Sequence, residues 1–256
     1  MDSQMLWWPS PHGPARVIVP IVASDAADAD RQAQAIADCD ADLVEWRADA
    51  WSGVLTPGEA VELSCRLRNT VAPKPLIFTW RTAGEGGCAT PAADERYREI
   101  TAAVIDARSA DLADVQINHP AAVHLLDTAR NTGMPVIGSW HDVNGTPESE
   151  AIVAALAQAE VDGASVAKVA VTPHNPADVA ALLSATAERA AVARVPLVTM
   201  AMGSLGLVSR VFGYVFGSQA TFAVVGQSSA PGQPSLLELR KAWDSSLGVA
   251  GQLGPA

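Results

Sequence analysis

Eight short, apolar, β-like runs alternate with longer alanine-rich helical stretches along this 256-residue chain. No low-complexity linker interrupts the alternation, so the pattern predicts one α/β domain in which helices connect parallel strands. The predicted strands begin near Val17, Asp42, Pro75, Asp111, Pro135, Ala164, Val195 and Thr221. The predicted helices cover Asp28 to Cys39, Pro57 to Arg68, Ala92 to Arg108, Ala121 to Asn131, Pro147 to Val161, Pro176 to Ala193 and Ser235 to Leu247, and the segment from Met202 through Arg210 to Gly217 is ambiguous.

Eight βα units in about 250 residues match the closed (β/α)8 TIM barrel in strand number and size. An open doubly wound sheet is the alternative, but the first βα turn carries no glycine-rich phosphate fingerprint. We therefore predict a single barrel domain over residues 1–256, with an N-terminal extension at 1–15 and a flexible tail at 248–256. In such a barrel, active residues lie at the carboxyl ends of the strands or in the loops that follow them.

Lys168 is the single charge in an apolar run, residues 164–171, that has the composition of a strand buried on both faces. Burial of an unpaired ammonium is costly, so such a lysine either has a partner or has a lowered pKa. A neutral amine in this position can attack a ketone and form a Schiff base. A structural lysine in a buried ion pair, or one that reaches solvent at the strand end, is the alternative interpretation.

The predicted second strand holds Glu45 and Arg47 two residues apart, so both side chains project from one face near the strand end. They can share a ligand there, or they can form a local ion pair that stabilises the barrel mouth. The third strand runs into a loop, residues 81–87, in which Arg81 and Glu85 stand among glycines. Glycines allow such a loop to approach a small ligand closely.

The predicted fifth strand ends at His141, where a barrel enzyme positions a catalytic group, so His141 is our candidate general acid and base. The adjacent pair of His141 and Asp142 is also a fragment of a metal site. No second histidine or cysteine stands at ligand spacing beside this pair, so we predict that no metal is required.

The last two βα units supply Arg210 and a loop of small and polar residues at 226–234. The guanidinium of Arg210 stays charged and can bind a carboxylate in bidentate fashion, although an arginine in a helix is also commonly a surface residue. The segment from Ser229 to Gln233 can close over a ligand, or it can form only the turn that precedes the last helix.

The acidic composition constrains the partners and the location of the protein. The formal charge of -11 and the pI near 4.8 disfavour nucleic acid and anionic membrane surfaces, because both attract clustered lysine and arginine. The three cysteines follow neither metal-ligand spacing nor the even number of a disulfide framework, which indicates a reducing compartment. The N-terminus lacks a basic start, and no segment approaches the roughly 20 apolar residues that span a bilayer. We therefore expect a cytoplasmic protein that binds a small molecule.

Seven segments, in order along nearly the full chain, closely resemble the motifs of one family, the type I 3-dehydroquinate dehydratases. The segments are Asp42 to Arg47, Arg81 to Gly87, Ser139 to Asp142, Lys168 to Val171, Thr199 to Gly203, Ser209 to Arg210 and Ser229 to Gln233. Enzymes of this family are lyases that convert 3-dehydroquinate to 3-dehydroshikimate in the shikimate pathway of aromatic amino acid biosynthesis. Any one segment is weakly diagnostic, whereas seven in order are highly specific.

The resemblance implies a role for each candidate residue. Lys168 would form an imine with the ketone of the substrate, and His141 would remove the adjacent proton and later protonate the departing hydroxyl. Glu85 would orient and polarise His141, and Arg210 would bind the substrate carboxylate. The other implied substrate-binding residues are Glu45, Arg47, Arg81, Ser229 and Gln233. An iminium acidifies the adjacent carbon, so this set of residues needs no metal or organic cofactor. The family also implies a homodimer.

A few positions depart from the family pattern. Gln116 stands where a second acidic residue is usual, which bears on the support around Lys168. The stretch from Gly203 to Gly206 lacks a charged pair often found there, and Trp7 and Trp8 have no counterpart in the pattern.

The residues alone leave two other functions open. An aldolase-type Schiff-base lyase shares the chemistry of a barrel lysine with a nearby acid and base, and cleavage of a sugar phosphate would identify it. The lack of an evident phosphate-binding loop disfavours this alternative. A non-catalytic ligand-binding barrel would bind dehydroquinate without turnover. The sequence also does not separate aromatic biosynthesis from quinate breakdown, because both use the same reaction.

Overall fold

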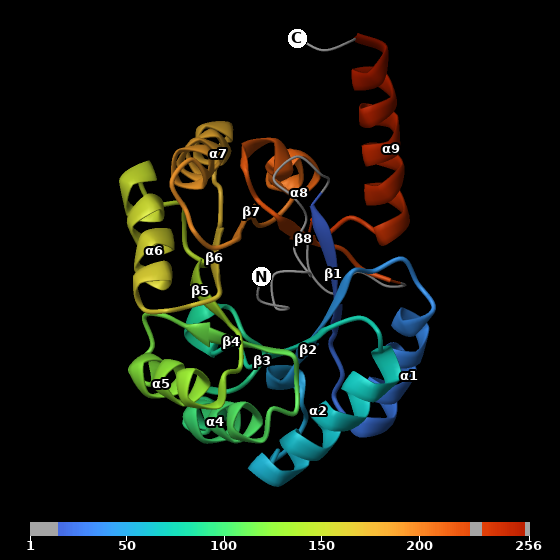
Figure 1. Ribbon diagram of the computed structural model, residues 1–256, viewed down its shortest axis with the longest axis vertical. Helices are drawn as coiled ribbons and strands as arrows, with labels where there is room; N and C mark the ends of the chain where they lie inside the picture. Colours follow the sequence, from blue (N-terminus) through green and yellow to red (C-terminus); the bar gives the residue numbers. More distant parts are fainter. Residues whose placement is uncertain (1–14, 226–231, 254–256) are drawn as a thin grey trace.

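Eight parallel strands form a ring, and helices cover the outside of the ring (Figure 1). The structure is a computed structural model, and it describes residues 15–225 and 232–253. The strands follow the order β7-β6-β5-β4-β3-β2-β1-β8, and a parallel bridge between Leu197 and Ser218 joins β7 to the segment before β8. The ring is therefore nearly closed, and the predicted (β/α)8 barrel is confirmed.

The strands lie where the apolar runs predict them. They are β1 (Arg16–Ile21), β2 (Leu43–Arg47), β3 (Leu76–Thr79), β4 (Leu112–Gln116), β5 (Val136–Asp142), β6 (Val166–Val171), β7 (Leu197–Ala201) and β8 (Ala220–Phe222). The helices are α1 (Ala26–Ala37), α2 (Pro57–Val71), α3 (Pro91–Asp94), α4 (Tyr97–Ala107), α5 (Ala122–Thr132), α6 (Ser149–Val161), α7 (Pro176–Ala190), α8 (Leu207–Phe212) and α9 (Leu236–Leu253), with 3-10 turns η2 (Ala48–Ala50), η3 (Ala83–Glu85) and η4 (Gly213–Phe216). Each strand begins within two residues of its predicted start, because turn-forming and polar residues bound the short apolar runs.

Several helix ends follow directly from the local sequence. Thr56 and Asn175 cap α2 and α7 through capping boxes with Glu59 and Asp178, and a proline begins each of these helices. Gly133 ends α5 in the left-handed conformation that glycine adopts at low cost.

The predicted helix from Ala92 to Arg108 is two helices, α3 and α4. The Asp94 carboxylate at the end of α3 accepts hydrogen bonds from Trp80 Nε1 at 3.2 Å and from Ala83 N at 2.7 Å. These contacts tie α3 to the loop after β3, which separates it from α4. The ambiguous segment after Met202 contains α8 and η4.

The C-terminus also differs from the prediction. Because α9 runs through Leu253, helix occupies residues 248–253 of the predicted tail, and its C-terminal part extends beyond the ring (Figure 1). Residues 254–256 and residues 1–14, which include Trp7 and Trp8, lie outside the described residues. Among the helices of the described ranges, none combines the length and the apolar character needed to cross a membrane.

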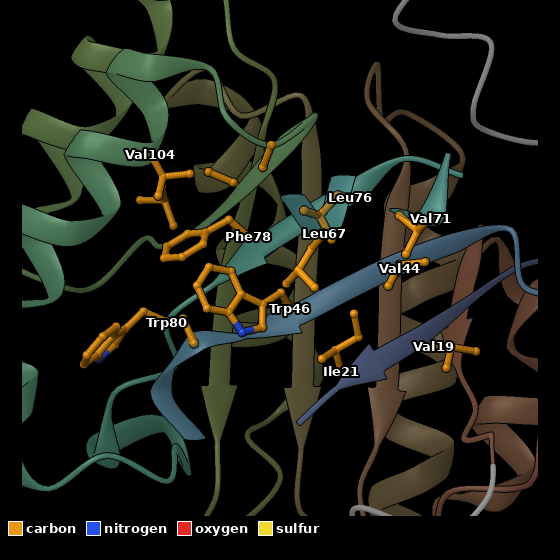
Figure 2. Close-up of a cluster of buried hydrophobic side chains, with 14 of the residues drawn as sticks. Val19, Ile21, Val44, Trp46, Leu67, Val71, Leu76, Phe78, Trp80 and Val104 are labelled. Carbon is orange, nitrogen blue, oxygen red and sulfur yellow. The ribbon is translucent and has the colours of Figure 1, made fainter. Parts of the chain in front are cut away.

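Because side chains alternate along the strands, the described residues form two apolar clusters between strands and helices and a third inside the barrel. Outward-facing residues of β1, β2 and β3 pack against α2 and α4, and Figure 2 shows this cluster, in which the rings of Trp46 and Phe78 meet edge to face 5.5 Å apart. Inward-facing apolar residues that fill the barrel include Ile18, Leu43, Ile77, Leu112, Ile137, Val166 and Val198. Because the side-chain period of a strand is two, the residues two or four positions after these also face the interior, nearer the carboxyl ends.

Candidate active site

One cavity of about 370 Å³ lies at the carboxyl ends of the strands. The predicted site residues that line it are Glu45, Arg47, Arg81, Glu85, His141, Lys168, Arg210 and Gln233. Ser229 lies outside the described residues. The barrel therefore brings together side chains from βα units that are far apart in the sequence.

Lys168 lies within β6, faces the barrel interior and lines the cavity, with its side chain only 5% exposed. Its Nζ donates a hydrogen bond to Asp114 Oδ2 at 3.3 Å and lies 3.9 Å from Glu45 Oε1. The ring centroid of Phe222 is 4.7 Å from Nζ. The ammonium is thus compensated by carboxylates on two other strands, as a buried cation requires. Lys168 therefore has the ion-pair partners expected of a structural lysine, and it also faces the cavity, as a lysine that forms a Schiff base must.

His141 and Glu85 both line the cavity and form a hydrogen bond with each other. Its Nδ1 lies 2.9 Å from Glu85 Oε2, so an ionised Glu85 accepts a hydrogen bond from Nδ1–H and favours the tautomer in which Nε2 carries the lone pair that a general base needs. Burial, together with the cations Arg81, Lys168 and Arg47, holds the pKa of His141 well below its ordinary value. Burial also raises the pKa of Glu85 to about 7. His141 is therefore neutral at neutral pH.

An NMR titration of the free protein should give a midpoint for the His141 imidazole below 6.5, because burial and nearby cations disfavour the imidazolium. The His141 resonance is assigned from its absence in the spectrum of a His141→Gln variant. A midpoint at or above 6.5 would contradict the electrostatic effect of burial and the three cations.

Arg47 pairs with Asp49 and not with Glu45. Arg47 Nε and Nη2 donate to the two Asp49 carboxylate oxygens at 2.8 and 2.7 Å. Burial alone would lower the pKa of Arg47, but this bidentate contact outweighs burial and raises it. Glu45 instead accepts a hydrogen bond from Thr79 Oγ1 at 2.9 Å and lies close to Lys168. Arg47 therefore forms a local ion pair at the barrel mouth, but with Asp49 and not with Glu45, the partner that the spacing predicted.

Arg81 is engaged mainly by protein groups, although it lines the cavity. Its Nη1 donates to Glu85 Oε2 at 3.0 Å and to Ser139 Oγ at 2.9 Å. Its Nη2 forms an ion pair with Asp114 Oδ2 at 2.8 Å. Burial would lower the pKa of Arg81, but Asp114 and Glu85 outweigh burial and raise it. Arg81 is therefore a fixed cation between two carboxylates.

Two glycines shape the loop that carries Glu85. Gly86 has φ of 81°, in the left-handed region, and Gly87 N donates to Thr82 O at 2.9 Å. A Cβ atom on Gly87 would lie 1.8 Å from the carbonyl oxygen of Arg81. This close approach of two backbone segments explains why glycines stand at this position.

Gly87→Ala should lower kcat/KM by about 100-fold, because the loop must shift and a displacement of about 1 Å at a catalytic group has an effect of that size. Gly84→Ala is the matched control, since its Cβ would meet only Thr82 Oγ1, at 4.0 Å. Steady-state kinetics of both variants test the prediction, which fails if the two variants are equally active.

Arg210 lies on α8, is 4% exposed and lines the cavity. Its Nη1 contacts Met200 Sδ at 3.7 Å, and among the described residues its Nε has no hydrogen-bond partner. Burial lowers the pKa of Arg210 to about 10, so the guanidinium is still charged at neutral pH. A buried cation that faces a cavity without a carboxylate partner in the described part of the chain is suited to bind an anion of a ligand.

The site also contains residues that the sequence reasoning did not assign. Asp49 holds Arg47 and accepts hydrogen bonds from the backbone of the β3 loop, at Arg81 N and Cys88 N. Asp114 binds Lys168, Arg81 and Ser139. An acidic residue two positions after an inward apolar residue is the signal that could have found Asp114, since it follows Leu112 on β4.

The structure also locates Gln116, where the family pattern has an acidic residue. Its Oε1 accepts hydrogen bonds from Thr82 Oγ1 at 2.9 Å and from Thr82 N at 3.4 Å. Gln116 thus supports the β3 loop, and the side chain on β4 that contacts Lys168 is Asp114.

Within residues 15–225 and 232–253, no group of three or more His, Cys, Asp or Glu side chains is arranged to hold a metal ion.

Comparisons with known proteins give a consistent result. A family model described as Type I 3-dehydroquinase matches residues 17–248. The chain is 40% identical to 3-dehydroquinate dehydratase of Enterococcus faecalis over 231 residues, which cover 89% of this chain and 91% of that protein. The crystal structure of 3-dehydroquinate dehydratase from Geobacillus kaustophilus superposes with a TM-score of 0.87 at 34% identity and covers 93% of this chain and 92% of that one. A structure of the type I enzyme from Clostridium difficile, with covalently modified comenic acid, gives 0.85 at 33% identity, with 92% and 93% coverage.

Proposed function

Because this chain belongs to the type I 3-dehydroquinase family, we propose that it dehydrates 3-dehydroquinate through a Schiff base on Lys168, with His141 as general acid and base. The dehydration itself, a hydro-lyase reaction of the shikimate pathway, follows from membership in the family. The roles of individual residues rest on the geometry of the cavity. The observation that carries the proposal is that Lys168, His141 and Arg210 line one cavity.

The reaction begins when Lys168 gives up one ammonium proton and its Nζ, now a neutral amine, attacks the ketone carbon of the substrate. A C–N bond forms as the C=O bond breaks, the ketone oxygen leaves as water with two of the three protons of the original ammonium, and a protonated imine remains. Because the iminium withdraws electrons, a C–H bond on the adjacent carbon becomes acidic, and His141 accepts that proton. The electrons of the broken C–H bond form the new C=C bond as the hydroxyl on the next carbon departs, protonated by His141 to give water. Addition of water to the imine then releases the product and restores the lysine.

The surroundings of each group support its role. The low pKa of His141 keeps the imidazole neutral and ready to accept a proton. On neighbouring strands, Lys168 pairs in register with Ser139, so His141 lies two residues farther along the same inward face of β5. The Clostridium difficile relative holds covalently modified comenic acid, which agrees with a family site that forms covalent adducts. The match to a family of dehydratases also disfavours the aldolase and binding-barrel alternatives.

Substrate recognition is assigned to the remaining lining residues. We propose that Arg210 binds the carboxylate, and that Glu45, Arg47 and Gln233 contact the hydroxyl groups and the carboxylate. Arg81 contributes mainly by holding Glu85 and Asp114. Ser229 is proposed as a further ligand from the family pattern alone, since it lies outside the described residues.

Arg210→Gln should lower kcat/KM for 3-dehydroquinate by roughly 10- to 150-fold, because a hydrogen bond to a charged group contributes about 1.5–3 kcal/mol. The loss should appear mainly in KM, since the carboxylate is bound in the ground state as well as in the transition state. Arg66→Gln, which removes an exposed arginine paired with Asp30, is the control. An unchanged KM in Arg210→Gln would remove the carboxylate assignment.

The covalent mechanism is tested by incubating the protein with 3-dehydroquinate and borohydride, followed by peptide mass spectrometry. The expected result is a reduced adduct on Lys168 that is absent when substrate is omitted. Catalytic dehydration by folded protein without any adduct would overturn the Schiff-base proposal.

We further propose that residues 1–256 form one catalytic domain and act as a cytoplasmic homodimer. All three cysteines are free, as is usual in a reducing compartment. The apolar side chains of Leu207, Val208, Phe212 and Val215 on α8 and η4 are partly or largely exposed, which suits an interface with a second copy. Light scattering tests the dimer, and a monomer at micromolar concentration would contradict it.

A further inference from the structure

Asp114 is the most deeply buried carboxylate beside the nucleophile. It lies on β4 between Leu112 and Gln116, faces the barrel interior and is 1% exposed. Its Oδ1 accepts a hydrogen bond from Ser139 Oγ at 2.5 Å. Its Oδ2 lies 3.3 Å from Lys168 Nζ. Asp114 does not line the cavity that Lys168 lines, and the strand register places it level with Val166, two residues before Lys168.

Two cations keep Asp114 ionised in this buried position. Burial by itself would raise the pKa of Asp114, but Arg81 and Lys168 outweigh burial and hold the pKa below its ordinary value. Arg81 Nη2 lies 2.8 Å from the same oxygen, Oδ2, that Lys168 contacts. A carboxylate in this position compensates two positive charges, and its removal would leave both cations without their main buried partner.

Arg81 connects this carboxylate to the acid and base. Its Nη1 donates to Glu85 Oε2 at 3.0 Å, and the same Glu85 oxygen lies 2.9 Å from His141 Nδ1. A continuous series of ion pairs and hydrogen bonds therefore runs from Lys168 through Asp114, Arg81 and Glu85 to His141. Ser139 braces the centre of this series, because it donates to Asp114 and accepts from Arg81.

We propose that Asp114 is a positioning residue for the reaction, which holds Lys168 Nζ at the ketone and remains as the counter-ion of the protonated imine. This inference rests on the proposed Schiff-base function. Glu45 is less suited to this task, since it lies 3.9 Å from Nζ and lines the cavity, where it is available to the substrate. Asp114 acts on the chemical step through Lys168, so its loss should slow imine formation and leave substrate binding nearly unchanged.

The test compares Asp114→Asn with wild-type protein in a single turnover trapped by borohydride. The expected result is that kcat and the rate of adduct formation on Lys168 both fall by about 100-fold, while KM stays within about twofold. Asp111→Asn is the matched control, because Asp111 is a structural carboxylate at the start of β4 that accepts a hydrogen bond from Leu76 N. Asp111→Asn should change the melting temperature and leave the rate of adduct formation close to that of the wild type.

Several outcomes overturn the proposal. The proposal is wrong if folded Asp114→Asn forms the adduct at the wild-type rate. It is also wrong if Asp111→Asn slows adduct formation as much as Asp114→Asn does. If Asp114→Asn does not fold, the Ser139→Ala variant tests the proposal instead. This variant removes one hydrogen bond to Asp114 and keeps the charge of the Asp114 carboxylate. We expect adduct formation to slow by about tenfold in Ser139→Ala, in line with the loss of one hydrogen bond to a charged group, and an unchanged rate contradicts the inference. Absence of any adduct in the wild type would instead count against the Schiff-base function.

Discussion

Replacement of Lys168 by arginine should reduce turnover of 3-dehydroquinate by on the order of a million-fold, the scale on which loss of a covalent nucleophile acts. An arginine cannot form the imine, but it keeps a positive charge opposite Asp114 and Glu45. The measurement is steady-state turnover, together with borohydride trapping, which should yield no adduct at position 168.

The choice of arginine separates chemistry from stability. Lys168→Ala should also be inactive, but it removes the cation that Asp114 and Glu45 share, and breaking a buried pair destabilises a protein by about 3–5 kcal/mol. Melting curves of both variants distinguish these effects. Lys74→Arg is the control, since Lys74 Nζ donates to Ala37 O away from the cavity. Turnover at the wild-type rate in folded Lys168→Arg would exclude the covalent mechanism.

His141→Ala should lower kcat by roughly 10²- to 10⁴-fold, the usual contribution of general acid–base catalysis. Imine formation does not require the same proton transfer, so borohydride should still trap substrate on Lys168 in this variant. Together, the two results would show that His141 acts after the imine has formed and that Lys168 forms the imine.

His124→Ala provides the control for His141→Ala, because His124 is exposed on α5. It should keep the activity of the wild type. A fully active His141→Ala would remove the acid–base role, and a variant that neither turns over nor forms an adduct would assign His141 to imine formation instead.

The fold was predictable from the sequence because each βα unit carries its own local signals. The run around Lys168 is a clear example: its apolar residues predict a strand buried on both faces, and every residue of β6 is buried. The break between α3 and α4 was not predictable, because it accompanies the contacts of Asp94 with Trp80 and Ala83, which lie 14 and 11 residues earlier in the loop after β3. Local helix patterns carry no information about such a contact.

The sequence predicted which residues line the cavity better than it predicted the ion pairs between them. The eight predicted residues that the structure describes line the cavity, since barrel geometry collects the carboxyl ends of strands. Their catalytic and binding roles stay predictions. The partner of Arg47 and the engagement of Arg81 by Asp114 were not predicted. The strand pattern places Asp114 on the inward face of β4, but it does not indicate that Lys168 is the cation that Asp114 contacts.

The sequence by itself determined which segments are strands and helices, and through the two-residue period it determined that Glu45, His141 and Lys168 face one interior. Only the tertiary structure decided which charges meet there. Through β5 the register places Gln116 level with Lys168, so Asp114 lies one inward position earlier on β4, and from there its carboxylate contacts Lys168 Nζ at 3.3 Å. Ion pairs between strands depend on register and on closure of the ring, and neither is written in the local pattern of one strand.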